Sequence, residues 1–152
     1  MVKALFLDRD GTINIDRGYV HCREDFVFIN GVFDFCRNAQ DKGYLIIIIT
    51  NQSGIARGYY TEADYNSLTT WMLEEFSKRN VRITDIFHCP DLSGPNRKPE
   101  PGMFLSARDK YGIDMANSIA IGDKHRDVEA GERAGVGKNI LFTGSFEGIV
   151  LP

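Results

Sequence analysis

Residues 4–12 read Ala4-Leu5-Phe6-Leu7-Asp8-Arg9-Asp10-Gly11-Thr12, an apolar run that ends in two aspartates and a glycine. The apolar residues predict a buried strand, and Gly11 allows a sharp turn directly after it. Asp8 and Asp10 would then lie at the carboxyl end of the strand, beside a space the size of a metal ion. One carboxylate could attack phosphorus while the other handles the proton, with Mg²⁺ holding the phosphate. Taken alone, the pair is equally compatible with a polar turn after a strand.

The bulk composition limits the classes of protein. We expect residues 1–152 to form a single domain, since this length suffices for one hydrophobic core. The net charge of −3 and the pI of about 5.6 argue against a general binder of nucleic acid or of anionic membranes. No apolar stretch is long enough to span a membrane, and the first residues do not resemble a signal peptide. We expect a monomer, with a weak dimer as the alternative.

The cysteines are odd in number and include no Cys-x-x-Cys pair: Cys22, Cys36 and Cys89. This pattern favours reduced thiols and a cytoplasmic protein.

Strands and helices are predicted to alternate along the chain. Strands are expected at about 2–8, 44–50, 83–89, 118–122 and 138–142. Helices are expected at about 31–42, 62–79, 101–111 and 125–134. Thr61 is the expected N-cap of the second helix, whose apolar stripe would contain Tyr65, Leu68, Met72, Leu73 and Phe76. The alternation predicts an α/β fold, a Rossmann-like three-layer sandwich with five or six parallel strands. In such folds ligands bind outside the carboxyl ends of the strands.

Four segments carry polar residues to that predicted edge. They are Asp8 with Asp10, Thr50-Asn51-Gln52-Ser53-Gly54, Arg97-Lys98-Pro99, and Gly122-Asp123 with Asp127. Each has an ordinary alternative, because Thr50 could cap a helix, Lys98 could be a solvated loop lysine, and Asp127 could serve only a helix dipole. In this order they supply a nucleophile, a hydroxyl for phosphate, a neutralising cation and a metal ligand. These are the parts that an aspartyl-phosphate hydrolase requires.

On these four motifs the chain resembles the haloacid dehalogenase-like phosphatase superfamily over essentially its whole length. Within it the chain is most similar to the heptose 1,7-bisphosphate phosphatases, on residues 16–21, 50–58, 97–103 and 122–124. The resemblance implies removal of the C7 phosphate of D-glycero-D-manno-heptose 1,7-bisphosphate, in heptose or lipopolysaccharide biosynthesis. The related histidinol-phosphate phosphatases share the core motifs but usually differ just after Thr50-Asn51-Gln52, so histidinol phosphate or another small sugar phosphate is the alternative substrate.

The resemblance also implies roles for individual residues. Catalysis would fall to Asp8, Asp10, Thr50 and Lys98, and Mg²⁺ would bind Asp8, Asp123 and the backbone carbonyl of Asp10. Substrate would contact Asp16, Arg17, Gly18, Tyr19, Asn51, Gln52, Ser53, Arg57, Arg97 and Lys124. A second phosphate would lie near Arg57, Arg97, Lys124 and Arg126. The short spacing between motifs predicts a capless fold, with residues 12–28 as a mobile flap over the entrance and with Tyr19, Tyr59 and Tyr60 lining it.

The family's zinc loop is not matched. Relatives commonly carry Cys-x-His and then Cys-x-Cys before the Arg-Lys-Pro motif, whereas this chain reads Cys89-Pro90-Asp91 and has no Cys-x-Cys there. His88 and Cys89 are neighbours on a predicted strand and should point to opposite faces. We therefore expect no structural zinc.

Two functions from other classes are weaker. A receiver-type phosphoacceptor domain also uses Asp, Thr, Lys and Mg²⁺, but there the lysine comes last, whereas here Lys98 precedes Gly122-Asp123. A non-catalytic binder of sugar phosphate would not need all four motifs.

Overall fold

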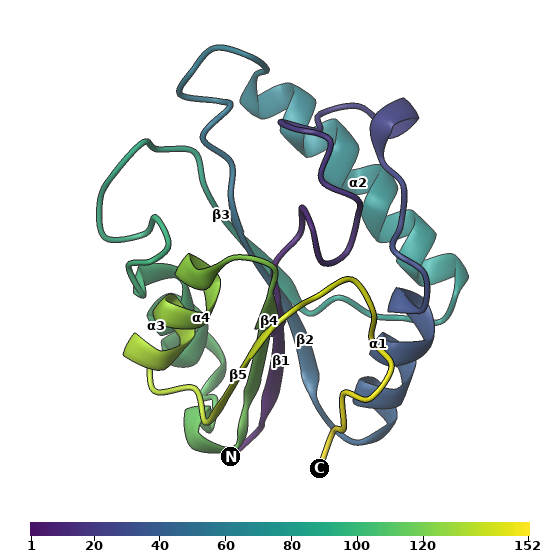
Figure 1. The fold of residues 1–152 in the computed structure, drawn as a ribbon, viewed down its shortest axis with the longest axis vertical. Coiled ribbons are helices and arrows are strands. Elements are labelled where there is room, and N and C mark those ends of the chain that lie inside the picture. Colours follow the sequence, from purple (N-terminus) through teal and green to yellow (C-terminus); the bar gives the residue numbers. More distant parts are fainter.

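The structure is a computed structural model that describes residues 1–152. Its centre is one sheet of five strands, in the order β3-β2-β1-β4-β5 (Figure 1). The strands are β1 (Ala4–Leu7), β2 (Leu45–Asn51), β3 (Asp85–Cys89), β4 (Ile119–Gly122) and β5 (Lys138–Leu141). All four strand pairs are parallel. The predicted parallel α/β sheet is therefore confirmed, with five strands.

The strand order reverses between β1 and β4. The chain runs outward from β1 through β2 to β3, then returns to place β4 on the other side of β1. In parallel α/β sheets the crevice for a ligand opens at such a reversal, beyond the carboxyl ends of the strands. Both chain termini lie at the opposite edge of the sheet (Figure 1).

Helices cover both faces of the sheet. They are α1 (Val32–Asp41), α2 (Glu62–Lys78), α3 (Gly102–Tyr111) and α4 (His125–Arg133), with short 3₁₀ helices at Arg23–Asp25 and Met115–Asn117. In Figure 1, α1 and α2 lie on one side of the sheet and α3 and α4 on the other.

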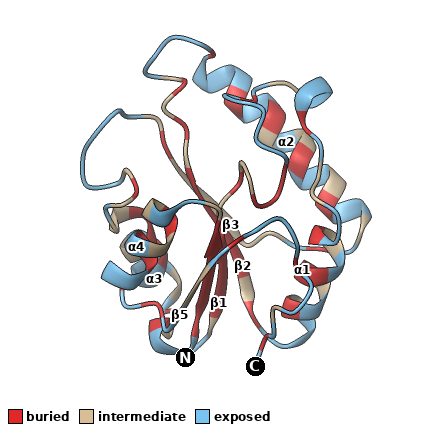
Figure 2. Ribbon diagram, in the orientation of Figure 1, coloured by how far each residue is buried: buried red, intermediate tan, exposed pale blue.

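Successive residues of β1 supply two separate cores. Leu5 and Leu7 pack with the buried residues of α1 and α2, while Ala4 and Phe6 pack with those of α3 and α4. This follows from the strand's two-residue period, with both faces covered. The central strands are buried throughout (Figure 2).

Helix α2 shows one departure from the predicted stripe. Thr61 caps it as expected, with its side chain and that of Asp64 bonding each other's backbone N–H groups. Tyr65, Leu68, Met72 and Phe76 are buried, but the prediction for Leu73 was wrong, because that side chain is 36% exposed. Residue 73 is rotated about 100° from Met72 around the helix axis and so leaves the buried face.

The segment 12–28 is attached to the core. Ile13, Val20 and Phe26 belong to the cluster packed against α1 and α2, and Asn14 forms an isolated bridge with Phe28. The predicted flap is therefore anchored at three buried side chains, with exposed runs at residues 15–19 and 23–25 between them. None of the helices combines the length and the apolar character needed to cross a membrane.

Candidate active site

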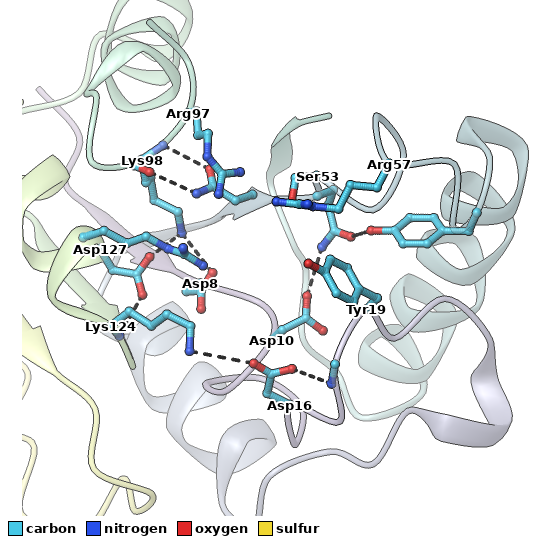
Figure 3. A pocket seen from close by; sticks show the side chains of 15 residues that line it. Asp8, Asp10, Asp16, Tyr19, Ser53, Arg57, Arg97, Lys98, Lys124 and Asp127 are labelled. Atoms are coloured by element: carbon cyan, nitrogen blue, oxygen red, sulfur yellow. Dashed lines mark hydrogen bonds and ion pairs between the residues drawn. The ribbon is translucent and has the colours of Figure 1, made fainter. Parts of the chain in front are cut away.

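A polar pocket of about 360 Å³ opens at the carboxyl ends of the strands, and only two of its 15 lining residues are hydrophobic. It brings together most of the predicted site residues. These are Asp8, Asp10, Asp16, Gly18, Tyr19, Asn51, Gln52, Ser53, Arg57, Arg97, Lys98 and Lys124. Figure 3 shows Lys98, Asp8 and Asp127 gathered on one side of it, with Arg57 and Tyr19 on the other.

Three predicted residues do not line the pocket. Thr50 is buried beside it and Asp123 lies next to Asp8, so both remain part of the same cluster. Arg17 is exposed and is not among the lining residues, and its role as a substrate contact stays a prediction. Arg17 is followed by Gly18, where the chain turns with a φ of 80°. The backbone N–H of Gly18 donates to the side chain of Asp16.

Lys98 is the central cation of the site. Its ammonium group is buried and donates to Asp8 Oδ1 at 2.9 Å and to the carbonyl of Ile49 at 2.7 Å, and it lies 2.7 Å from Asp127 Oδ1. Burial alone would lower the pKa of Lys98, but Asp8 and Asp127 outweigh this and raise it. Lys98 therefore carries a fixed positive charge at the pocket floor.

Asp8 is enclosed by the same groups. Burial and the carboxylate of Asp127 raise the pKa of Asp8 well above its usual range, and the Lys98 ammonium opposes that rise. A further cation would keep this carboxylate ionised.

Asp8, Asp123 and Asp127 can each place one carboxylate oxygen within 4.8 Å of the others. Asp123 Oδ1 is buried without a hydrogen-bond partner, which leaves it available to a ligand. The backbone carbonyl of Asp10 likewise accepts no hydrogen bond. Oxygen donors of this kind suit a hard divalent cation such as Mg²⁺.

Gly11 makes room for this cluster. Its φ is +94°, and a Cβ atom there would lie 2.0 Å from Asp123 Oδ2. Both the backbone conformation and the space therefore require glycine.

The side chain of Asp10 is held by four hydrogen bonds. Arg9 donates twice, Asn14 donates at 3.0 Å to Oδ1, and Gln52 donates at 3.0 Å to Oδ2. Arg9 is itself buried and also donates to the carbonyl of Val20. The Asp10 carboxylate thus points in one fixed direction at the pocket.

Four further cations lie in the pocket wall: Arg57, Arg97, Lys124 and Arg126. Lys124 lies 3.9 Å from Asp16 and 3.6 Å from Asp123, and Arg97 donates only to the carbonyl of Asp91. Arg57 and Arg126 have no acidic partner within 4.0 Å, although Arg126 is half-buried. Such a wall favours a ligand with more than one negative charge.

Two residues were not placed in the site from sequence, Arg9 and Asn14, which hold Asp10. Asp127 was placed at this edge without a role, and in the structure it joins Lys98 to the backbone N–H of Lys124 at the start of α4. The four-residue spacing between Asp123 and Asp127, about one helical turn, was the only signal for Asp127. Of the three tyrosines expected at the entrance, Tyr19 and Tyr60 line the pocket, and Tyr59 packs edge-on against Tyr19.

His88 and Cys89 point to opposite faces, as predicted. Cys89 is buried in the core beneath α3 and α4, whereas the ring of His88 stacks on Tyr65 and bonds Glu62.

The strand order, the strand-end aspartates and the buried lysine define a haloacid dehalogenase-like hydrolase. A family model described as "HAD-hyrolase-like" matches residues 95–148. The chain is 54% identical over 140 residues to the D-glycero-alpha-D-manno-heptose-1,7-bisphosphate 7-phosphatase of Campylobacter jejuni, covering 91% of this chain and 81% of that protein. It is 51% identical to the corresponding beta-anomer enzyme of Vibrio cholerae, covering 91% and 80%.

A solved structure agrees with these relatives. The D,D-heptose 1,7-bisphosphate phosphatase of B. bronchiseptica, complexed with magnesium and phosphate, superimposes with a TM-score of 0.84 at 30% identity, over 90% of this chain and 79% of that one. The chain belongs to the heptose-1,7-bisphosphate 7-phosphatase family.

Proposed function

We propose that this protein hydrolyses the C7 phosphate ester of D-glycero-D-manno-heptose 1,7-bisphosphate through an aspartyl-phosphate on Asp8. The main support is the position of Asp8 at the pocket floor. Asp8 accepts a hydrogen bond of 2.9 Å from the buried Lys98 and lies next to the carboxylates of Asp123 and Asp127. A nucleophile, a fixed cation and a set of oxygen ligands at one point are what phosphoryl transfer to a carboxylate needs. The names of the relatives support the sugar and the position of the phosphate.

Mg²⁺ fits the donor set. Asp8, Asp123 and the free carbonyl of Asp10 would hold it, and the unpartnered Oδ1 of Asp123 supports this assignment. When bound, Mg²⁺ would neutralise phosphate charge and keep the Asp8 carboxylate ionised. The solved relative that contains magnesium and phosphate supports the choice of metal.

The first step is attack of an Asp8 oxygen on phosphorus. The new Asp8–phosphorus bond forms as the bond from phosphorus to the sugar oxygen breaks, and Asp10 donates a proton to that oxygen. Lys98, through its ammonium, and Thr50, through its hydroxyl, stabilise the charge on the remaining phosphate oxygens.

The second step releases phosphate. A water molecule attacks the phosphorus of the aspartyl-phosphate, Asp10 accepts its proton, and the bond from phosphorus to Asp8 breaks. The products are inorganic phosphate and the free Asp8 carboxylate, with Asp10 protonated for the next cycle. The fixed direction of the Asp10 side chain suits both proton transfers.

The second phosphate of the substrate would contact the basic wall. Arg57, Arg97, Lys124 and Arg126 lie in the same pocket as Asp8. Charge-assisted hydrogen bonds to phosphate are stronger than neutral ones, and arginine can make them in pairs. This arrangement favours a bisphosphate over a simple phosphate ester.

The test is phosphate release by the purified chain with Mg²⁺. The substrates are both anomers of D-glycero-D-manno-heptose 1,7-bisphosphate, histidinol phosphate and p-nitrophenyl phosphate. Phosphorus NMR identifies which phosphate leaves. We expect loss of the C7 phosphate with a kcat/KM at least about tenfold above that for histidinol phosphate. Efficient hydrolysis of histidinol phosphate without turnover of either bisphosphate anomer would contradict the proposal.

A further inference from the structure

Gln52 lies in the pocket wall, where its side chain joins three other groups. It is only 2% exposed. Its Nε2 donates to Asp10 Oδ2 at 3.0 Å and to Thr50 Oγ1 at 2.9 Å, and its Oε1 accepts from the hydroxyl of Tyr60. Both N–H groups are therefore used within the protein, and neither is left for a substrate. The amide of Gln52, which was predicted as a substrate contact, thus bonds groups of the protein at both ends.

The hydroxyl of Tyr60 fixes which way the Gln52 amide points. If the amide were reversed, its oxygen would face the carboxylate of Asp10 and its N–H groups would face Tyr60. Burial raises the pKa of Tyr60 to about 12, so the phenol keeps the proton that it donates. The amide therefore presents its N–H groups to Asp10 and Thr50.

The ring of Tyr60 is itself held on two sides. It stacks on His21 with ring centroids 5.2 Å apart and an interplanar angle of 8°. On another side it fills the space above Gly54, where a Cβ atom would lie 2.2 Å from the tyrosine ring. These contacts fix the ring of Tyr60 and so hold its hydroxyl in position to donate to Gln52.

The bond from Gln52 also determines the role of the Thr50 hydroxyl. Because Thr50 Oγ1 accepts from Gln52, its own hydrogen points elsewhere. The alternative acceptor in the protein is the carbonyl of Asn51, at a long 3.4 Å. The hydroxyl hydrogen is therefore available to a phosphate oxygen.

We propose that Gln52, oriented by Tyr60, is a positioning residue that sets the donor direction of Thr50 and the carboxylate direction of Asp10 together. In this role Gln52 acts through Thr50 and Asp10. This inference rests on the proposed function, because it takes the catalytic roles of Thr50 and Asp10 from there. It adds that one buried amide, that of Gln52, links the Thr50 hydroxyl, which would bind phosphate, to the Asp10 carboxylate, which would transfer the proton.

The first experiment compares Tyr60→Phe with Tyr44→Phe, with heptose bisphosphate as substrate. Both tyrosines are buried and each hydroxyl makes one hydrogen bond, but Tyr44 bonds the carbonyl of Pro152, at the far edge of the sheet. Tyr60→Phe should lower kcat about three- to tenfold, with KM changed by less than about twofold. Tyr44→Phe should leave both constants within about twofold of the unmodified chain. Equal kcat values for the two variants would overturn the proposal.

The second experiment asks whether Tyr60 acts through Gln52. Gln52→Leu should lower kcat by about a hundredfold or more. Adding Tyr60→Phe to Gln52→Leu should change kcat by less than about twofold, because the residue that Tyr60 orients is gone. If the fall in kcat of the double variant equals the product of the two single falls, Tyr60 acts independently of Gln52 and the proposal is overturned. If Gln52→Leu does not fold, as judged by thermal unfolding, the tyrosine comparison alone decides.

Gln40→Leu is the control for Gln52→Leu, since Gln40 also bonds through both ends of its amide, to Asn80 and Arg82, far from the pocket. A wrong proposed function would give a different result from a wrong role for Gln52. The unmodified chain would then not release the C7 phosphate, and the variants would be compared with p-nitrophenyl phosphate instead.

Discussion

The Nζ atom of Lys98 lies 2.9 Å from Asp8 Oδ1, although the two residues are 90 positions apart in the chain. The loop that carries Lys98 is fixed by a reciprocal pair of hydrogen bonds, in which the Asn51 amide accepts from the Lys98 N–H and donates to its carbonyl. The end of β2 therefore holds the lysine that faces the end of β1. This contact places a permanent positive charge beside the proposed nucleophile.

Asp8→Asn should abolish turnover, because a neutral amide cannot attack phosphorus. We expect kcat with heptose bisphosphate to fall by at least about a thousandfold. Asp114→Asn is the matched control, since Asp114 lies beside the 3₁₀ helix at the other end of the sheet. Substantial activity in purified Asp8→Asn would overturn the assignment of the nucleophile.

Asp10→Asn should slow turnover by about 10²–10⁴-fold, the usual contribution of a general acid or base. It should still bind Mg²⁺, because the proposed ligand atom is the backbone carbonyl of residue 10, which the substitution leaves in place. Calorimetric titration with Mg²⁺ measures this. Complete loss of Mg²⁺ binding in a folded Asp10→Asn protein would contradict the proposed ligand set.

Gly11→Ala should weaken Mg²⁺ binding by about 10- to 100-fold, because the new methyl group would displace the carboxylate of Asp123. Gly43→Ala is a close control. Gly43 has a φ of +88°, but a Cβ atom there meets nothing within 4 Å. Both variants should lose about 1–2 kcal/mol of unfolding free energy to backbone strain, and only Gly11→Ala should lose Mg²⁺ affinity. Equal Mg²⁺ affinities would show that Gly11 does not protect the metal site.

Arg97→Ala should reduce the preference for heptose 1,7-bisphosphate over p-nitrophenyl phosphate. A charge-assisted hydrogen bond contributes about 1.5–3 kcal/mol, so kcat/KM should fall by about 10- to 100-fold for the bisphosphate and much less for the simple ester. Arg82→Ala, on the surface at the opposite edge of the sheet, is the control. Equal losses for both substrates would instead place Arg97 in the catalytic centre, and no loss for either would make it a solvated loop residue.

Zinc should be absent from the purified protein. The prediction rests on the missing Cys-x-Cys and on the opposite orientations of His88 and Cys89. Elemental analysis of protein prepared without chelators should find well under one zinc per chain. Stoichiometric zinc that disappears in Cys89→Ser would contradict this reading of the loop.

The sequence by itself determined the fold class and the motif positions. The run of isoleucines in β2 and the alternation of strands with helices sufficed for a parallel sheet, because both signals are local and periodic. Asp8, Asp10, Lys98 and Asp123 could be assigned to one edge, because parallel strands bring their carboxyl ends together.

Only the tertiary structure decided which groups bond to one another. No periodic pattern specifies the side-chain directions on which these bonds depend. Examples are the ion pair of Asp127 with Lys98, the hydrogen bonds from Arg9 to Asp10 and the hydrogen bond from Tyr60 to Gln52. Leu73 shows the same limit in reverse, since it fits the apolar pattern of its helix but is exposed. Periodicity places a residue on an element, whereas a hydrogen bond depends on distance and angle between elements, which are fixed only when the whole chain packs.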